Sequence, residues 1–239
     1  MEVEARAVMN SKEKTNIGNL FDSISHSYDR FNHLLSLNAD RRWRRNAIKG
    51  IEPVESLLDV AAGTADLSIE AVRQNKASAV TGIDISSGML SIGRDKVAKS
   101  GMQERISLVT ASALEMPFDD GCFGAVVCAY GVRNFSDLDA GLREMHRVLA
   151  DGGQLMILEF SYPDNRFIRV LYDWFFSNVM PLVGKTLSHN AGAYTYFRDS
   201  VKGFIWGREM ASRIEAAGFR DVTFRTMTFG ITTVYYAFK

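Results

Sequence analysis

Two aspartates at the ends of neighbouring apolar segments are the first residues whose spacing could bind a ligand. Asp59 lies in the run SLLDV, and Asp84 closes SAVTGID 25 residues later. In open α/β sheets, ligands bind beyond the carboxyl ends of the strands. An acid that closes the second strand can accept hydrogen bonds from a ribose diol. The two aspartates therefore predict a site for a nucleoside-type ligand, although an acid at a strand end is often only a helix cap.

The loop that follows Asp59 is poor in glycine. It reads AAGTAD, with Gly63 as its one glycine, whereas a loop that cradles a pyrophosphate reads G-x-G-x-x-G. Gly63 permits a close backbone approach, and Thr64 or Asp66 can hydrogen-bond a polar group, although Asp66 can also simply complement the helix dipole. A ligand with a ribose and no diphosphate fits this loop, and S-adenosylmethionine has that description.

Two later segments are expected at the same edge of the sheet, where Ile85 also follows Asp84 directly. In TASALEMPF (110–118), Ser112 and Ala113 could meet an adenine and Met116 could cover it. The segment CAYGVRNF (128–135) leaves the fourth strand and supplies the remaining candidates, Ala129, Arg133 and Asn134. Met116 alone would more often belong to a core, and Arg133 could equally lie on the surface.

The elements that would position these residues alternate in type. Short apolar runs without polar alternation indicate parallel strands buried on both faces, and helical periodicity separates them. The predicted strands are 56–60, 78–84, 106–111, 123–130 and 154–160, and the predicted helices are 65–74, 87–99, 137–149 and 208–219. VTFRTMTFG and ITTVYYAFK then predict a terminal antiparallel hairpin. The pattern is that of a doubly wound α/β fold.

The chain is expected to form one domain of 239 residues. Its predicted parts are a helical arm over 1–50, a cofactor-binding core over 51–160, a helical substrate cap over 161–205, and a C-terminal helix and hairpin over 206–239. We find no internal repeat or linker. The oligomeric state cannot be predicted from the sequence.

The charge balance argues against nucleic acid as the main partner. Lys and Arg together number 28, and Asp and Glu together also number 28, whereas a phosphate backbone demands a basic excess. The start of the chain lacks the apolar segment of a secretory signal, and no run is long enough to span a bilayer. Cys122 and Cys128 have no partners at metal-site spacing, so we expect a reduced, cytoplasmic protein without a metal.

Longer motifs carry a family resemblance over nearly the whole chain. They are FDSISHSYDRFNHLLSLNADRRWRR, LLDVAAGTADLS, GIDISSGMLSIGRDK, ALEMPFDDGCFGAVVCAYGVRNFSD, REMHRVLADGGQLMILEFSYP and AYTYFRDSV. In this order they resemble the menaquinone and ubiquinone C-methyltransferases, which methylate a ring carbon of polyprenylated quinols with S-adenosylmethionine. The resemblance implies a Rossmann-like class I methyltransferase fold.

Residue by residue, the resemblance implies two sets of contacts. Thr64, Asp84 and the pair Ser112–Ala113 would contact S-adenosylmethionine, and Arg133 and Asn134 would lie near the reacting ring. There are also departures from the family pattern. Ala62 and Ala65 stand where the family carries glycines, and Ala129 stands where relatives often carry serine.

The chemistry implied is an in-line methyl transfer to a ring carbon. A ring carbon becomes a good nucleophile when the adjacent hydroxyl loses its proton, so we expect the reduced quinol to be the substrate. Arg133 could stabilise the phenolate. The candidates for the proton acceptor are Asp119, His189 and Tyr194.

The isoprenoid tail would need an apolar surface. The segment YDWFFSNVMPLVG (172–184) and the aromatic residues of the arm could supply it, or they could simply pack the cap on the core. RRWRR (41–45) could contact anionic headgroups or be a solvated helix face. We therefore predict peripheral membrane contact.

Three other functions can be compared with this one. A methyltransferase for another acceptor, such as a phenol, sterol or lipid amine, would share the cofactor site. A non-catalytic binding protein would explain the altered AAGTAD loop. An NAD-dependent oxidoreductase would need the glycines of the G-x-G-x-x-G loop, which this chain does not have. Whether the ring is a naphthoquinol, a benzoquinol or either is left open by the sequence.

Overall fold

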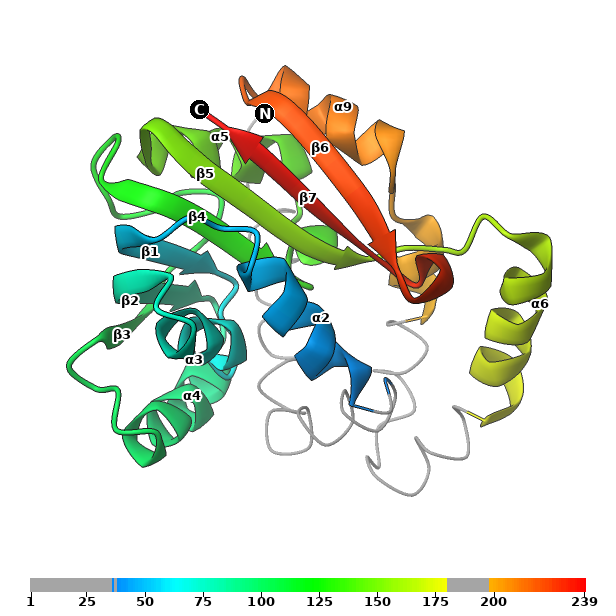
Figure 1. The fold of residues 1–239 in the computed structure, drawn as a ribbon, viewed down its shortest axis with the longest axis horizontal. Coiled ribbons are helices and arrows are strands. Elements are labelled where there is room, and N and C mark those ends of the chain that lie inside the picture. The colour runs from blue at the N-terminus through cyan, green and yellow to red at the C-terminus, as the bar shows by residue number, and fades with distance from the viewer. Residues whose placement is uncertain (1–35, 37, 180–197) are drawn as a thin grey trace, which may run out of the picture.

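The computed structural model describes residue 36 and the ranges 38–179 and 198–239. Its centre is one seven-stranded sheet with the strand order β3-β2-β1-β4-β5-β7-β6 (Figure 1). The strands are β1 (Val54–Val60), β2 (Ala77–Asp84), β3 (Ile106–Thr110), β4 (Phe123–Ala129), β5 (Leu149–Phe160), β6 (Arg220–Met227) and β7 (Thr232–Phe238).

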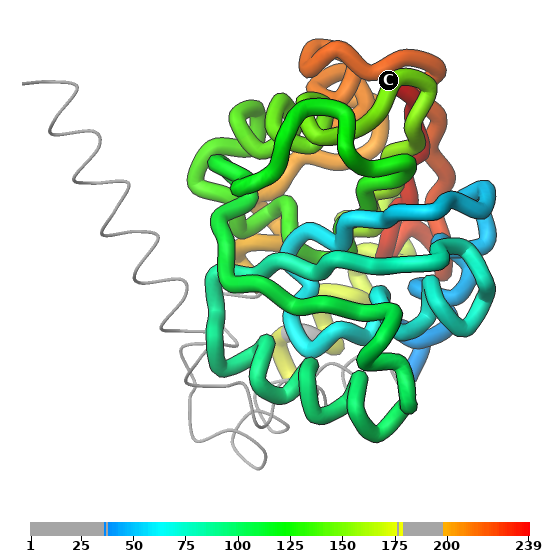
Figure 2. The backbone as a smooth tube through the Cα atoms, turned by 90° about the vertical axis from the view of Figure 1, so that its left-hand side faces the viewer, coloured from blue at the N-terminus to red at the C-terminus, as the bar shows by residue number. Residues whose placement is uncertain are grey.

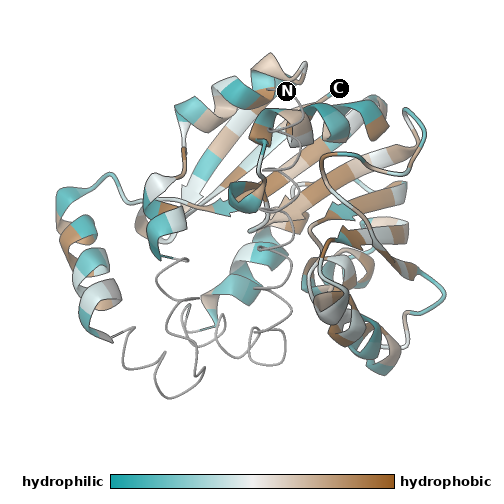
Figure 3. Cartoon of the chain, turned by 180° about the vertical axis from the view of Figure 1, so that it is seen from behind, coloured by the Kyte–Doolittle hydropathy of each residue, from teal (hydrophilic) through white to brown (hydrophobic). Residues whose placement is uncertain are grey.

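The first five strands run parallel, β7 is reversed, and β6 runs in the same direction as the first five. β1 pairs with both β2 and β4, so the strand order reverses beside β1 and places the switch point between β1 and β4. β7 runs antiparallel to β5 and to β6. The central strands are apolar over most of their length, as Figure 3 shows, because both faces of the sheet are covered. The predicted doubly wound sheet with a terminal hairpin is confirmed.

Helices cover both faces of this sheet (Figure 2). On one face, α2 and α3 pack with the cluster around Trp43, Ile48 and Leu57. On the other, α5 and α9 pack with the cluster around Leu142 and Ile214. The helices are α2 (Ala39–Ile48), α3 (Asp66–Arg73), α4 (Ser87–Lys99), α5 (Leu138–Val148), α6 (Arg166–Trp174) and α9 (Arg208–Ala216), with short turns η1 (Val132–Asn134), η2 (Phe175–Val179) and η3 (Thr228–Gly230).

Most element boundaries agree with the sequence prediction to within two residues, and two differ by more. β5 begins at Leu149 rather than at 154, because Leu149 pairs with Phe123 before the chain passes Gly152 at φ 75°. α9 ends at Ala216 rather than at 219, and Phe219 then turns into the core beside His146. The turn at Gly152 therefore lies within β5, whereas α9 ends before Gly218.

The helical arm and the cap are described only in part. α2 confirms helix over 39–48 within the arm, and α6 and a helix over 198–203 lie within the cap. α6 stands apart from the sheet, on the side of the β6–β7 turn (Figure 1). In the part of the chain that is described, no helix is both long and apolar enough to cross a bilayer.

Candidate functional site

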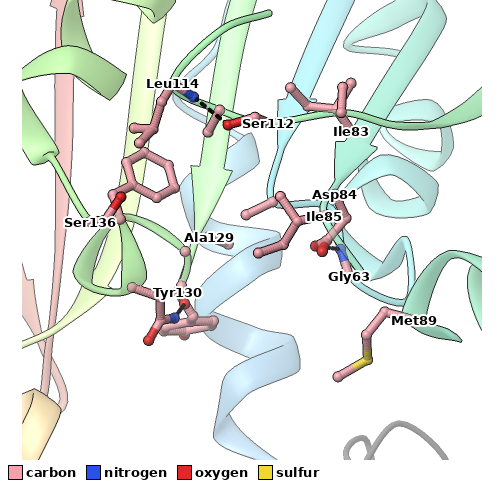
Figure 4. A pocket seen from close by; sticks show the side chains of 16 residues that line it. Gly63, Ile83, Asp84, Ile85, Met89, Ser112, Leu114, Ala129, Tyr130 and Ser136 are labelled. Carbon is pink, nitrogen blue, oxygen red and sulfur yellow. Dashed lines mark hydrogen bonds between the residues drawn. The ribbon is translucent and has the colours of Figure 1, made fainter. Parts of the chain in front are cut away.

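A pocket opens at the carboxyl ends of the parallel strands, beside the switch point (Figure 4). It holds about 820 Å³ of empty space, including the part open to solvent. The lining residues come from the loops after β1, β2, β3 and β4: Ala61, Gly63, Ile83, Asp84, Ile85, Met89, Ala111, Ser112, Ala113, Leu114, Ala129, Tyr130, Gly131, Asn134, Phe135 and Ser136. The lining is mostly apolar, with a carboxylate on one side.

That carboxylate, Asp84, is held by two backbone groups. Its Oδ2 accepts from the N–H of Gly63 at 2.9 Å, and its Oδ1 accepts from the N–H of Ser86 at the same distance. Figure 4 shows the Asp84–Gly63 bond joining the ends of β1 and β2 at the pocket. Each carboxylate oxygen has a second lone pair that can accept from a ligand. Asp84 is thus oriented for a diol.

The loop after β1 is built from left-handed backbone. Ala61 has φ 57°, Gly63 φ 54° and Ala65 φ 65°. A Cβ atom added at Gly63 would find no neighbour within 4 Å, so this glycine faces open space where a ligand can approach the backbone. Ala65 caps α3 in a conformation that favours glycine, whereas Ala62 is not in the left-handed region. Of Ala62 and Ala65, only Ala65 therefore carries backbone strain.

A second, smaller pocket adjoins the first on the other side of this loop. It holds about 360 Å³ and shares Ala61, Gly63, Ala129 and Tyr130 with the larger one. Its other lining residues are mostly polar: Arg44, Asp59, Ala62, Thr64, Asp66 and Leu67. The larger pocket is therefore the apolar end of one site and the smaller pocket its charged end, and the loop after β1 lies between them.

Charged contacts organise the smaller pocket. Lys96 of α4 donates to the Oγ1 of Thr64 at 3.0 Å and pairs with Asp66. Asp59 is buried and accepts from the hydroxyl of Ser68 at 2.6 Å. Burial raises the pKa of Asp59 to about 7, and the Ser68 bond opposes that shift only in part.

Arg133 lies next to the larger pocket in a buried ion pair. Its Nη1 donates to the Oε1 of Glu159 at 2.7 Å and to the carbonyl of Tyr130 at 2.7 Å. The backbone N–H of Arg133 donates to the other oxygen of Glu159 at 3.3 Å. Its guanidinium carbon lies 5.4 Å from the ring centroid of Phe160. Glu159 thus fixes both the side chain of Arg133 and the turn η1.

The structure brings most of the sequence-predicted residues together. Gly63, Asp84, Ile85, Ser112, Ala113, Ala129 and Asn134 line the larger pocket, and Asp59, Gly63, Thr64, Asp66 and Ala129 line the smaller one. Arg133 lines neither pocket. His189 and Tyr194 lie outside the described residues.

Met116 is placed differently from the expectation. We expected it to cover an adenine, but it is 4% exposed and packs in the core cluster behind the pocket. Its backbone N–H donates to Glu144 at 2.7 Å, which holds this segment against α5. The apolar wall is supplied by Met89 and Leu114 instead.

The segment RRWRR is also less of a surface patch than expected. Arg41, Arg42 and Arg45 are exposed, but Trp43 is buried and its Nε1 donates to Thr228 at 2.8 Å. Arg44 is buried and lines the smaller pocket. Its i, i+4 spacing from Asp40 was the one signal in the sequence for this position.

Among the residues that sequence reasoning missed are two that line the larger pocket and one buried residue beside it. Tyr130 and Phe135 flank turn η1, and Glu159 is the buried partner of Arg133. Tyr130 follows an apolar strand and is itself apolar in part, so it gave no sign of a bend. Its φ of 61° turns the chain across the mouth of both pockets. Glu159 could have been noticed as a lone acid in an otherwise apolar strand.

The residues present fit S-adenosylmethionine. Asp84 is preset for a ribose, the apolar wall suits an adenine, and the backbone at Gly63 is open to a ligand. The adjoining charged pocket suits the amino-acid end of the cofactor. No feature of either pocket favours a diphosphate over this ligand.

Comparison with known proteins agrees with this geometry. The chain is 42% identical over 230 residues to a demethylmenaquinone methyltransferase of Bacteroides fragilis, covering 95% of this chain and 94% of that protein. It is 45% identical over 222 residues to a ubiquinone/menaquinone biosynthesis C-methyltransferase of Geobacter sulfurreducens, covering 92% and 86%.

A solved structure matches the fold. An S-adenosylmethionine-dependent methyltransferase of Thermotoga maritima, described as a possible histamine N-methyltransferase, superposes with a TM-score of 0.65 at 16% identity, covering 92% of this chain and 99% of that one. The fold is that of a class I methyltransferase. The model of the ubiE/COQ5 methyltransferase family matches residues 8–239. With Asp84 and the switch-point pocket where such an enzyme holds S-adenosylmethionine, the chain belongs to the ubiE/COQ5 methyltransferase family.

Proposed function

We propose that this enzyme transfers the methyl group of S-adenosylmethionine to a ring carbon of a polyprenylated quinol, with demethylmenaquinol as the preferred substrate. The observation that carries the proposal is the cofactor-sized pocket at the switch point in a chain 42% identical to a demethylmenaquinone methyltransferase. A benzoquinol of the ubiquinone pathway is a second candidate, because the Geobacter sulfurreducens relative is named for both pathways.

The cofactor supplies an electrophilic methyl group on a sulfonium, and the protein has to orient it and exclude water. Asp84 would hold the ribose, while Ser112, Ala113 and Leu114 would enclose the base. Holding the acceptor in line at about 3–3.5 Å supplies much of the rate enhancement. Asn134 lines the pocket from turn η1 and would orient the quinol hydroxyl.

The role of Arg133 follows from its ion pair. Glu159 neutralises the guanidinium, so the pair carries little net charge toward a phenolate. We therefore assign Arg133 a positioning role, in which it fixes η1 and thus Asn134. Asp119 is exposed and lines neither pocket, so His189 and Tyr194 are retained as candidates for the proton acceptor.

We also propose peripheral contact with the membrane that holds the substrate. On α6, an apolar face is exposed at i, i+3, i+4 and i+7: Phe167, Val170, Leu171 and Trp174. Phe167 is 70% exposed and Trp174 is 59% exposed. This arrangement is typical of a helix that lies in the interface plane of a bilayer, and Trp is favoured at that level.

The test is a transfer assay with methyl-labelled S-adenosylmethionine. Short-chain demethylmenaquinol is supplied under reducing conditions, with a ubiquinone-pathway benzoquinol and the oxidised demethylmenaquinone in parallel. We expect label on the naphthoquinol and none on the oxidised ring, whose carbons are electron-poor. Cofactor binding without label on either quinol would exclude this function and favour another acceptor.

A further inference from the structure

The smaller pocket contains a cation that comes from outside the cofactor-binding core. Arg44 belongs to α2, in the predicted arm. Among the described residues that line this pocket, it is the one that is not in or next to β1, α3 or β4. The carboxylates Asp59 and Asp66 line the same pocket, and Lys96 pairs with Asp66. A guanidinium beside carboxylates complements a zwitterion.

Arg44 is rigidly held. Its Nη1 donates to the Oδ2 of Asp40 at 2.6 Å, one turn earlier in α2, and lies 3.6 Å from Asp66. The guanidinium carbon lies 5.4 Å from the ring centroid of Tyr130, so the cation stacks over an aromatic residue that lines both pockets. Burial alone would lower the pKa of Arg44, but attraction to Asp66 and Asp40 outweighs it and raises that pKa, which keeps the group charged.

The helix that carries Arg44 is anchored on both sides of this residue. Trp43 donates to Thr228 at 2.8 Å and packs edge-on against Phe160, with ring centroids 6.2 Å apart. Arg45, on the outer side, is exposed and pairs loosely with Glu70 at 3.4 Å. Since the contacts with Asp40 and Asp66 both involve Nη1, the other N–H donors of this planar guanidinium can bind a further carboxylate in a bidentate manner.

S-adenosylmethionine carries a matching group. Its adenosine end fits the larger pocket, and the shared residues Ala61, Gly63, Ala129 and Tyr130 leave the smaller pocket for its other end. That end is an α-amino acid with a carboxylate and an ammonium group. Resting on the proposed function, we infer that Arg44 binds the carboxylate of S-adenosylmethionine and thereby makes helix α2 part of the cofactor site.

The test compares two ligands that differ in that one group. S-adenosylmethionine and decarboxylated S-adenosylmethionine share the adenosine, the sulfonium and the amine, and their affinities can be measured by calorimetry. In Arg44→Gln we expect S-adenosylmethionine to bind about 10- to 100-fold more weakly, the loss of a charge-assisted bidentate contact. The decarboxylated ligand should change by less than about threefold, because it lacks the group that Arg44 recognises.

The matched control is Arg45→Gln, which removes a neighbouring guanidinium that is 65% exposed. It should leave both affinities unchanged. Arg44→Lys keeps the charge without the planar fork and should recover part of the affinity for S-adenosylmethionine only. Thermal unfolding of each variant checks that the fold is retained.

Two results would overturn the inference. Equal weakening of both ligands by Arg44→Gln would make Arg44 a structural support of the pocket, and no weakening of either would remove it from the site. If the unaltered protein binds neither ligand, the proposed function itself is wrong.

Discussion

Arg133 and Glu159 form an ion pair that is almost completely withdrawn from solvent, with side chains 4% and 1% exposed and a bond of 2.7 Å between Nη1 and Oε1. Glu159 also accepts from the backbone N–H groups of Arg133 and Phe160. One carboxylate thus ties β5 to the turn that carries Asn134 to the pocket. The pair links the stability of the sheet to the geometry of the site.

Breaking this pair should lower the stability of the folded protein. Glu159→Gln leaves a buried guanidinium without its counter-ion, and we expect the free energy of unfolding to fall by about 3–5 kcal/mol in urea titrations. The double variant Arg133→Met/Glu159→Met should recover much of that loss. As a control, Asp139→Asn breaks the exposed pair with Arg213 and should cost less than about 1 kcal/mol. Similar losses in Glu159→Gln and Asp139→Asn would contradict this account.

Asp84 should determine cofactor affinity. Asp84→Asn keeps one acceptor for the loop but removes the charge that would bind a ribose diol. We expect S-adenosylmethionine to bind about 10- to 100-fold more weakly by calorimetry. Asp95→Asn, an exposed change on α4, is the matched control. Unchanged affinity in Asp84→Asn would place the ribose elsewhere.

The strain at Ala65 can be measured by comparing two glycine substitutions. Ala65 and Ala71 are both fully buried in or next to α3, but only Ala65 has left-handed backbone. At position 65, glycine removes about 1–2 kcal/mol of backbone strain. At position 71, inside the helix, glycine only lowers the stability of the helix. We therefore expect Ala65→Gly to be more stable than Ala71→Gly by at least about 1 kcal/mol in urea unfolding. Equal stabilities would show that the loop carries no such strain.

Asp59 should make stability depend on pH. Its pKa is about 7 in the folded protein, whereas the ordinary pKa of an aspartate is 3.8. Between these values the folded protein keeps a proton that the unfolded chain releases, so stability falls as the pH rises from about 4 to 7. Asp59→Asn removes this penalty, and its advantage over the unaltered protein should be larger at about pH 8 than at about pH 5. An advantage that does not change with pH would mean that Asp59 ionises normally.

The apolar face of α6 should govern binding to lipid. We expect Phe167→Ser/Trp174→Ser to float with liposomes of anionic lipid much less than the unaltered protein, because each exposed ring loses burial in the interface. Phe238→Ser, at the exposed end of β7, is the matched control. Protein that stays at the bottom of the gradient before any substitution would exclude membrane contact through α6.

Much of this architecture could be predicted because its signals are local. The helix predicted over 87–99 agrees with α4, since Ser86 caps it through the N–H of Met89. Asp84 was predictable because it ends an apolar strand and follows Asp59 and its loop at the spacing of a nucleoside-binding sheet. Tyr130, Arg44 and Glu159 were harder to predict, since their roles depend on a left-handed turn and on partners in other elements that lie far away in the chain. Such contacts leave no periodic pattern in the sequence.

The position of β7 has a consequence for how the chain is made. β7 lies between β5 and β6, although both leave the ribosome before it. Until residues 232–238 join the sheet, β5 has an open backbone edge and β6 lacks its partner, a state that invites pairing between chains. A released chain truncated just before Thr232 should therefore aggregate more, and depend more on chaperones, than the full chain.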